Sequence, residues 1–211
     1  VAIFYGDAFA EAFPAIREIS AQSWVWILLA YSFVASVLPV WLLLQPRDYL
    51  NSHQLIPGLT LLALGLIVLH PTMQAPVINA SPPGAPPVIP FLFITIAGGA
   101  ISGFHGVVSA GTTSKQFSCM TDARPIGYGG MLGEGTRGLL AVLAATAGFA
   151  TTAYWWSHSE SWGAASGLSM KLAAFVNGGA TFIASIGIPT ATDRTFIAVM
   201  VIAFAATSLD T

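Results

Sequence analysis

Six apolar stretches dominate the sequence, and their length constrains the fold more than any other feature. They cover residues 24–44, 55–70, 91–109, 131–156, 170–188 and 195–211. An α-helix needs about 20 predominantly apolar residues to cross a bilayer, and inside the bilayer its backbone groups must be paired within the segment. We therefore expect an all-α fold, a polytopic transmembrane helical bundle of about six spans that forms a single domain over residues 1–211.

The composition excludes a water-soluble globular domain. Only 8% of the residues are charged and 55% are hydrophobic, whereas soluble domains carry about 25% charged residues. The chain has no basic stripe, so we expect no nucleic-acid partner. Cys119 is the single cysteine, which rules out an internal disulfide, and no Cys/His spacing suggests a metal site. We accordingly expect the lipid bilayer as a partner, and no cofactor and no metal.

The segments between the stretches are expected to be turns and loops. Residues 45–49 and 189–194 should form short polar turns, and residues 111–130 a polar loop. Seven prolines in residues 71–90 favour an extended, polyproline-like loop without regular helix or sheet. Pro39 should kink or end the first helix. Because the chain lacks an initiator methionine and stops inside an apolar stretch, we expect it to be a fragment of a longer protein.

Lysine and arginine are distributed unevenly across the expected spans. If the turn at residues 45–49 is cytoplasmic, five basic residues lie inside and two lie outside, which agrees with the positive-inside rule. The inner residues are Arg47, Lys115, Arg124, Arg137 and Arg194, and the outer ones are Arg17 and Lys171. The proline-rich loop then faces the outside.

Residues 98–116 differ from an ordinary lipid-facing helix. Five glycines, six hydroxyl or imidazole side chains and Lys115 occur together, although glycine weakens helices and lipid offers polar groups no partner. His105 either packs against a neighbouring helix or contacts a substrate or proton. The glycines suit close helix packing and an opened helix equally. The hydroxyls and backbone carbonyls from Ser109 to Ser114 suit coordination of an ion, or they form only a helix end capped at Gly111. Lys115 either attracts an anion to this segment or only extends its ammonium to the membrane interface.

Ionisable residues in two later stretches are further candidates. Glu134 and Arg137 are spaced i,i+3, so they can pair on one helix face, either structurally or as a gate or proton acceptor. Asp210 lies deep in the last apolar stretch, where a carboxylate is costly unless it is paired, neutral or bound to an ion. We expect no enzymatic activity, because Ser102 would need a base from another helix to act as a nucleophile.

Several segments together resemble the carbon-starvation protein family of membrane transporters. They are Pro46-Arg-Asp-Tyr-Leu-Asn-Ser52, Gly99-Ala-Ile-Ser-Gly-Phe-His105, Ser109-x-Gly-Thr-Thr-Ser-Lys115, Ile126-Gly-Tyr-Gly129 with Met131-Leu-x-Glu134, and Phe204-Ala-Ala-Thr-x-Leu-Asp-Thr211. The resemblance implies a leucine-transporter-like, inverted-repeat fold in the plasma (inner) membrane of a bacterium or archaeon. It also implies uptake of peptides or pyruvate, a small carboxylate or peptide substrate, and coupling to protons or sodium. The oligomeric state stays open.

The resemblance and the residue pattern agree on where the substrate should pass. A discontinuous helix exposes unpaired backbone groups, and helix N-termini favour carboxylates. We predict a substrate site lined by Ser102, Gly103, His105, Ser109, Gly111, Thr112, Thr113 and Lys115. Ion or proton coupling is assigned to Tyr128, Glu134 and Asp210. The alternative is a membrane module that senses nutrients without moving them.

Overall fold

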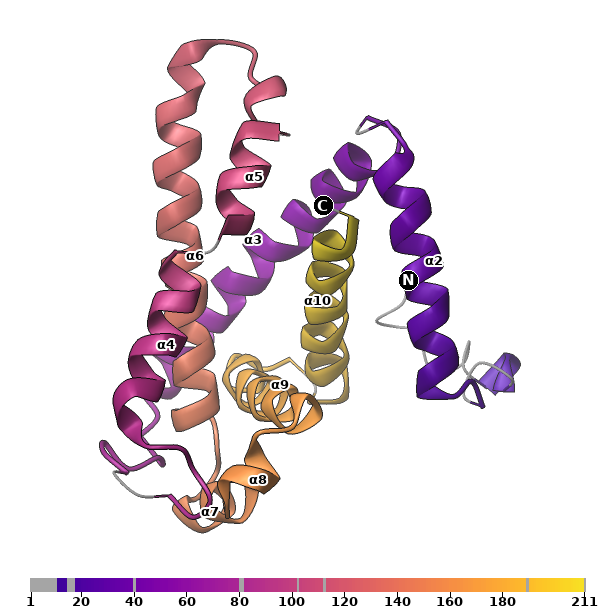
Figure 1. The fold of residues 1–211 in the computed structure, drawn as a ribbon. Helices are drawn as coiled ribbons and strands as arrows, with labels where there is room; N and C mark the ends of the chain where they lie inside the picture. Colours follow the sequence, from indigo (N-terminus) through magenta and orange to yellow (C-terminus); the bar gives the residue numbers. More distant parts are fainter. Residues whose placement is uncertain are drawn as a thin grey trace.

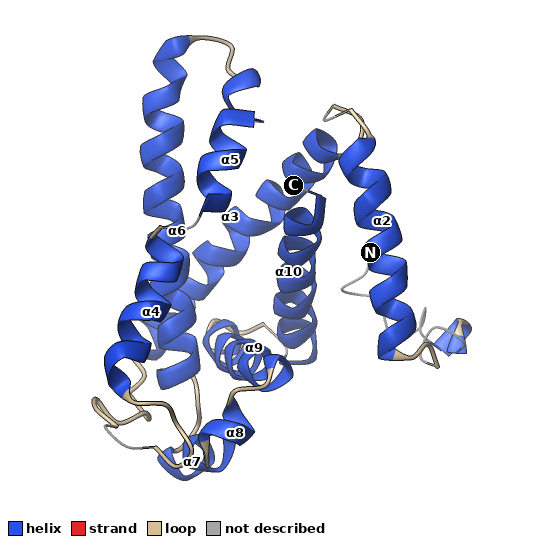
Figure 2. Ribbon diagram, viewed as in Figure 1, coloured by secondary structure: helices blue, strands red, loops and turns tan. Residues whose placement is uncertain are grey.

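The computed structural model describes residues 11–14, 18–39, 41–79, 82–101, 103–111, 113–188 and 190–210 of the chain. Every regular element in these ranges is a helix, so the expected all-α class is confirmed for the described part (Figure 2). The main α-helices are α2 (Ala21–Val37), α3 (Leu44–Leu69), α4 (Val88–Ala100), α5 (Gly103–Gly111), α6 (Ala123–Ala147), α9 (Leu168–Ala184) and α10 (Thr190–Asp210). Short elements are the 3-10 turns η2 (Thr113–Lys115) and η3 (Met120–Asp122), and the helices α7 (Thr152–His158) and α8 (Trp162–Ala165).

Four helices form the packed centre of the structure. Figure 1 shows α9 between the lower part of α6 and α10, with α3 crossing them. The buried core joins Leu62 of α3, Ala144 of α6, Phe182 and Ile183 of α9, and Ile197 of α10. Between helices in lipid, such side chains stabilise the packing through van der Waals contact. The upper part of α6 projects beyond this centre (Figure 1).

Glycines allow the central helices to approach closely. A Cβ at Gly178 would overlap the backbone carbonyl of Ala144, and one at Gly65 would overlap the backbone carbonyl of Phe182. Ser185 follows α9, and its hydroxyl lies within hydrogen-bond distance of two carbonyls, that of Phe182 at 2.6 Å and that of Gly65 at 3.1 Å. Small residues at such positions are typical of helix packing in membranes.

Two polar contacts connect α3 to its neighbours on either side. Arg47 donates to the hydroxyl of Tyr31 on α2 at 3.1 Å. Asn51 donates to the backbone carbonyl of Ala203 on α10 at 3.3 Å. The segment 46–52, which carries one of the family-like motifs, therefore lies where α2, α3 and α10 meet.

Prolines lie near one helix end and within the first turns of two other helices. Helix α2 ends at Val37, two residues before Pro39, as expected, so the first apolar helix is shorter than residues 24–44. The expected polar turn at residues 45–49 is part of α3, because Pro46 occupies the first turn, where its missing N–H has no helical partner anyway. Pro125 similarly occupies the first turn of α6, so residues 123–130 are helical rather than loop.

Two further boundaries also differ from expectation. Residues 190–194 belong to α10 rather than to a turn. The stretch 131–156 is not one straight helix, because α6 ends at Ala147 and the chain turns by 106° into α7. Gly148 sits at this bend, and a Cβ on it would overlap the backbone of Gly178 in α9. A close helix contact thus coincides with the turn.

The number of membrane spans is not established by helix length. Within the described residues, α3 is long and apolar enough to cross a bilayer, because it has 26 residues and contains an 18-residue window with a mean hydropathy of 1.7. The bent α6–α7 pair counts as a second only if it is one span. Helices α2, α4, α9 and residues 194–205 are apolar but shorter. Six spans therefore remain a prediction.

The proline-rich segment packs against the end of α6. Its described residues 71–79 and 82–87 contain no regular element, as expected, although α4 already begins at Val88. The backbone N–H of Gln74 donates to the carbonyl of Thr146 at 2.9 Å. The hydroxyl of Thr152 donates to the side-chain oxygen of Gln74 at 2.7 Å. These bonds hold the segment beside the α6–α7 bend.

Candidate functional site

The third apolar stretch is interrupted at the point where its composition changes. Helix α4 ends at Ala100, and Ile101 has φ −107° and ψ 26°, outside the helical region. Helix α5 begins at Gly103. Of the two alternatives left by the sequence, an opened helix and a closely packed continuous one, the non-helical backbone at Ile101 favours the opened helix. The backbone N–H of Ile101 still donates to the carbonyl of Ala97 at 2.9 Å, so α4 keeps its hydrogen bonding up to this point.

Several predicted substrate residues lie on α5 and the turn that follows it. Gly103 and His105 are part of α5, and Gly111 is its last residue. Thr113 and Lys115 lie in η2. Ser102, Thr112 and the side chain of His105 fall outside the described residues. The interpretation of His105 as a packing or a substrate residue therefore stays as predicted.

Two described serine hydroxyls of this segment bond to backbone carbonyls of α5. Ser109 donates to the carbonyl of Gly106 at 3.0 Å. Ser114 donates to the carbonyl of Ala110 at 2.7 Å. Such local bonds are usual for Ser in helices at membrane depth, where they satisfy the hydroxyl. A Cβ at Gly111 would meet nothing within 4 Å, so the surroundings of this helix end are open in the described structure.

Of the predicted coupling residues, Tyr128 lies on the projecting part of α6. Its side chain is 61% exposed. Asp210 is the last residue of α10, and its side chain falls outside the described residues. The structure therefore places Tyr128 and Asp210 on different helices without describing a contact between them.

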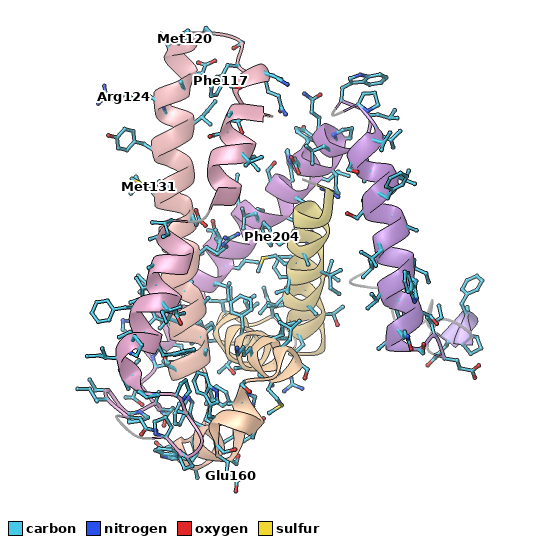
Figure 3. The ribbon with its side chains drawn as sticks, in the orientation of Figure 1. Phe117, Met120, Arg124, Met131, Glu160 and Phe204 are labelled. Atoms are coloured by element: carbon cyan, nitrogen blue, oxygen red, sulfur yellow. The ribbon has the colours of Figure 1, made fainter. Side chains whose placement is uncertain are left out.

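Glu134 and Arg137 form the predicted pair on α6. The distance between Arg137 Nη2 and Glu134 Oε1 is 3.7 Å, and the two side chains are 45% and 51% exposed. The guanidinium also lies over the ring of Phe204 on α10, 5.4 Å from the ring centroid. Figure 3 shows Phe204 between α10 and α6, while Arg124 and Met131 project from the opposite side of α6. The pair therefore faces the other central helices.

Two cavities lie beside this pair. The smaller has a volume of about 230 Å³ and the larger about 420 Å³. The smaller is lined by Leu55, Leu59, Leu62, Arg137, Gly138, Ala141, Phe175, Met200, Val201 and Phe204. The larger is lined by Leu55, Ile56, Leu59, Gly129, Gly130, Gly133, Glu134 and Arg137. Arg137 thus lines both cavities: the smaller is almost wholly apolar, and the wall of the larger includes the carboxylate of Glu134.

The sequence analysis missed Phe204 and the apolar wall of these cavities. A signal was present in the spacing of Met200, Val201 and Phe204, which share one face of a helix. The sequence alone does not show that this face lies beside Arg137, because that contact depends on the packing of α10 near α6. This site can recognise a ligand with opposite charges beside an apolar pocket. Among the described residues, no group of His, Cys, Asp and Glu side chains could hold a metal ion.

The sequence profile described as "Carbon starvation protein CstA" matches residues 1–178. The chain belongs to the carbon starvation protein family. Within this family it is 47% identical over 125 residues to the peptide transporter CstA of Escherichia coli, covering 57% of this chain and 18% of that protein. It is 44% identical over 134 residues to the peptide transporter CstA of Mycobacterium tuberculosis, covering 61% and 18%.

A relative with a different named substrate is equally similar. The pyruvate/proton symporter BtsT of Escherichia coli is 48% identical over 124 residues, covering 56% of this chain and 17% of that protein. The chain spans about a fifth of the length of these carbon starvation family relatives. No solved structure matches it. The relatives are named as transporters, which makes this a membrane transport protein family.

Proposed function

We propose that this chain is part of a secondary active transporter that takes up small carboxylate nutrients, as peptides or pyruvate, during carbon starvation. The proposal rests on one observation: the chain belongs to a family whose similar members are named a peptide transporter and a pyruvate/proton symporter. Proton coupling, with sodium as the other candidate, and location in the plasma (inner) membrane of a bacterium or archaeon are part of the proposal.

The proposed architecture follows from the family resemblance of the sequence. Six membrane-spanning segments of this chain would belong to a leucine-transporter-like, inverted-repeat bundle completed by the rest of a longer protein. The interrupted α4–α5 stretch supports this proposal, because transporters of that kind bind substrates at broken helices. Charged side chains that face other helices, as Glu134 and Arg137 do, are also typical of transport paths.

The proposed substrate path follows the helix break. It would be lined by Ser102, Gly103, His105, Ser109, Gly111, Thr112 and Thr113, with Lys115 attracting the anion. Backbone N–H groups at the start of α5 would favour a carboxylate. Glu134, Tyr128 and Asp210 would couple transport to an ion or proton.

Uptake by the full-length protein in liposomes tests both the activity and the path. Labelled pyruvate and a labelled dipeptide should accumulate against their gradients when a proton gradient is imposed, and a protonophore should abolish the accumulation. His105→Ala and Asp210→Asn should each reduce it at least tenfold. If both variants transport normally, the path is wrong. Ligand binding without any accumulation would instead identify a sensor.

A further inference from the structure

Arg137 connects two cavities with different chemistry. The cavities of about 230 Å³ and 420 Å³ share Leu55, Leu59 and Arg137 in their walls. Beyond this shared wall, the smaller cavity is lined by apolar side chains, whereas the larger contains Glu134. A ligand at Arg137 could therefore place an apolar group in one cavity and a polar group in the other.

Both charges at this boundary are accessible. The side chains of Arg137 and Glu134 are 45% and 51% exposed. Their separation of 3.7 Å is longer than an ordinary N–H···O hydrogen bond of about 2.7–3.2 Å. A guanidinium has five N–H donors in a planar fork that matches a carboxylate. Both side chains are therefore within reach of a ligand that enters either cavity.

The two opposite charges select the kind of ligand. A ligand with a carboxylate alone would be attracted by Arg137 and repelled by the nearby Glu134, and an ammonium alone would meet the reverse. A ligand that carries both groups on one carbon can place its carboxylate at Arg137 and its ammonium at Glu134. Every charge is then beside an opposite one, as buried or half-buried charges require.

The apolar cavity determines the size and polarity of the ligand's side chain. Its wall includes Phe175, Met200, Val201 and Phe204 from α9 and α10, and Ala141 from α6. Its volume of about 230 Å³ is below the ~300–1,000 Å³ usual for drug-sized ligands, so it suits one aliphatic or aromatic side chain. A ligand with a single methyl group, such as pyruvate, would leave most of it empty.

We propose that Glu134, Arg137 and the apolar cavity between α3, α6, α9 and α10 bind the zwitterion of a free α-amino acid with an apolar side chain. The α-carboxylate binds Arg137, the α-ammonium binds Glu134, and the side chain fills the cavity. This site is separate from the substrate path proposed above, so binding of the amino acid there does not rest on the proposed function. A dipeptide fits less well, because its two charged ends are separated by a peptide bond.

Equilibrium binding of radiolabelled leucine to the full-length protein in detergent tests the proposal. Leucine should bind, and unlabelled pyruvate should not displace it. Arg137→Gln and Glu134→Gln should each weaken binding at least tenfold. Arg124→Gln is the matched control, because Arg124 is on the same helix but projects from its opposite side (Figure 3), and it should bind leucine normally.

A second variant tests the cavity and does not depend on the charges. Ala141→Leu would fill part of the apolar cavity and should weaken leucine binding at least tenfold while changing alanine binding less than threefold. Absence of leucine binding, displacement by pyruvate as efficient as by leucine, or unchanged binding in Arg137→Gln would each overturn the proposal. Leucine binding without uptake of any substrate would support the site and contradict the proposed transport; uptake without leucine binding would do the opposite.

Discussion

Gly178 is the position at which the central helices approach most closely, so it allows a sharp test of the packing. Alanine there would place its Cβ against the backbone carbonyl of Ala144. A side-chain rotation cannot relieve an overlap with main chain, so α6 and α9 must separate. Overpacking of this kind costs about 1–3 kcal/mol, and we expect the upper end. Alanine regains about 1 kcal/mol through helix propensity, which leaves a net loss of about 2 kcal/mol.

Gly135→Ala is the matched control for this substitution. Gly135 lies in the interior of α6, and a Cβ there would meet nothing within 4 Å. The control should therefore keep its stability or gain up to about 1 kcal/mol. Thermal unfolding of the full-length protein in detergent, followed by tryptophan fluorescence, should show a lower midpoint for Gly178→Ala alone. Equal midpoints for the two variants would refute the close approach of α6 and α9.

Three further substitutions follow from individual contacts. Ser185→Ala removes the hydroxyl that lies within hydrogen-bond distance of the Phe182 and Gly65 carbonyls and should lower the free energy of unfolding by about 1 kcal/mol; an unchanged denaturation midpoint would contradict this. Phe204→Leu keeps an apolar residue but removes the ring under Arg137, and a double-mutant cycle with Arg137→Gln should give a coupling energy of about 0.5–1 kcal/mol; a coupling energy of zero would contradict the contact. Thr152→Val breaks the hydrogen bond to Gln74 and should speed amide hydrogen exchange at Gln74, measured by mass spectrometry. Thr136→Val is the control and should leave this exchange unchanged, because the Thr136 hydroxyl bonds only within α6 in the described structure.

The sequence predicted the helical class and the pairing of Glu134 with Arg137, because both depend on local information. Apolar runs define helices, and i,i+3 spacing places two side chains on one face. It also predicted that residues near Pro39 would end a helix and that the proline-rich segment would be irregular. These features follow from the geometry of proline alone.

Boundaries and long-range contacts were predicted less well. The expected turn at residues 45–49 and the expected loop at residues 111–130 both contain the start of a helix, because Pro46 and Pro125 are tolerated in a first helical turn. The 106° bend after α6 coincides with a close contact between Gly148 and Gly178 of α9, 30 residues further along the chain. The approach of Phe204 to Arg137 likewise depends on the packing of α10. No local pattern contains that information. The predicted site around residues 102–115 remains a prediction.

The glycine contacts of the central helices also bear on how such a protein could move. Helices that touch backbone to backbone, as at Gly65, Gly148 and Gly178, cannot slide past one another without first separating. We therefore expect α3, α6, α9 and α10 to travel as one rigid body during a conformational cycle. Helix α4 has no buried residue in the described structure and is separated from α5 by the break. A Cβ at Gly98 or Gly99 of α4 would meet nothing within 4 Å, so in the described residues no such close contact ties α4 to this rigid body.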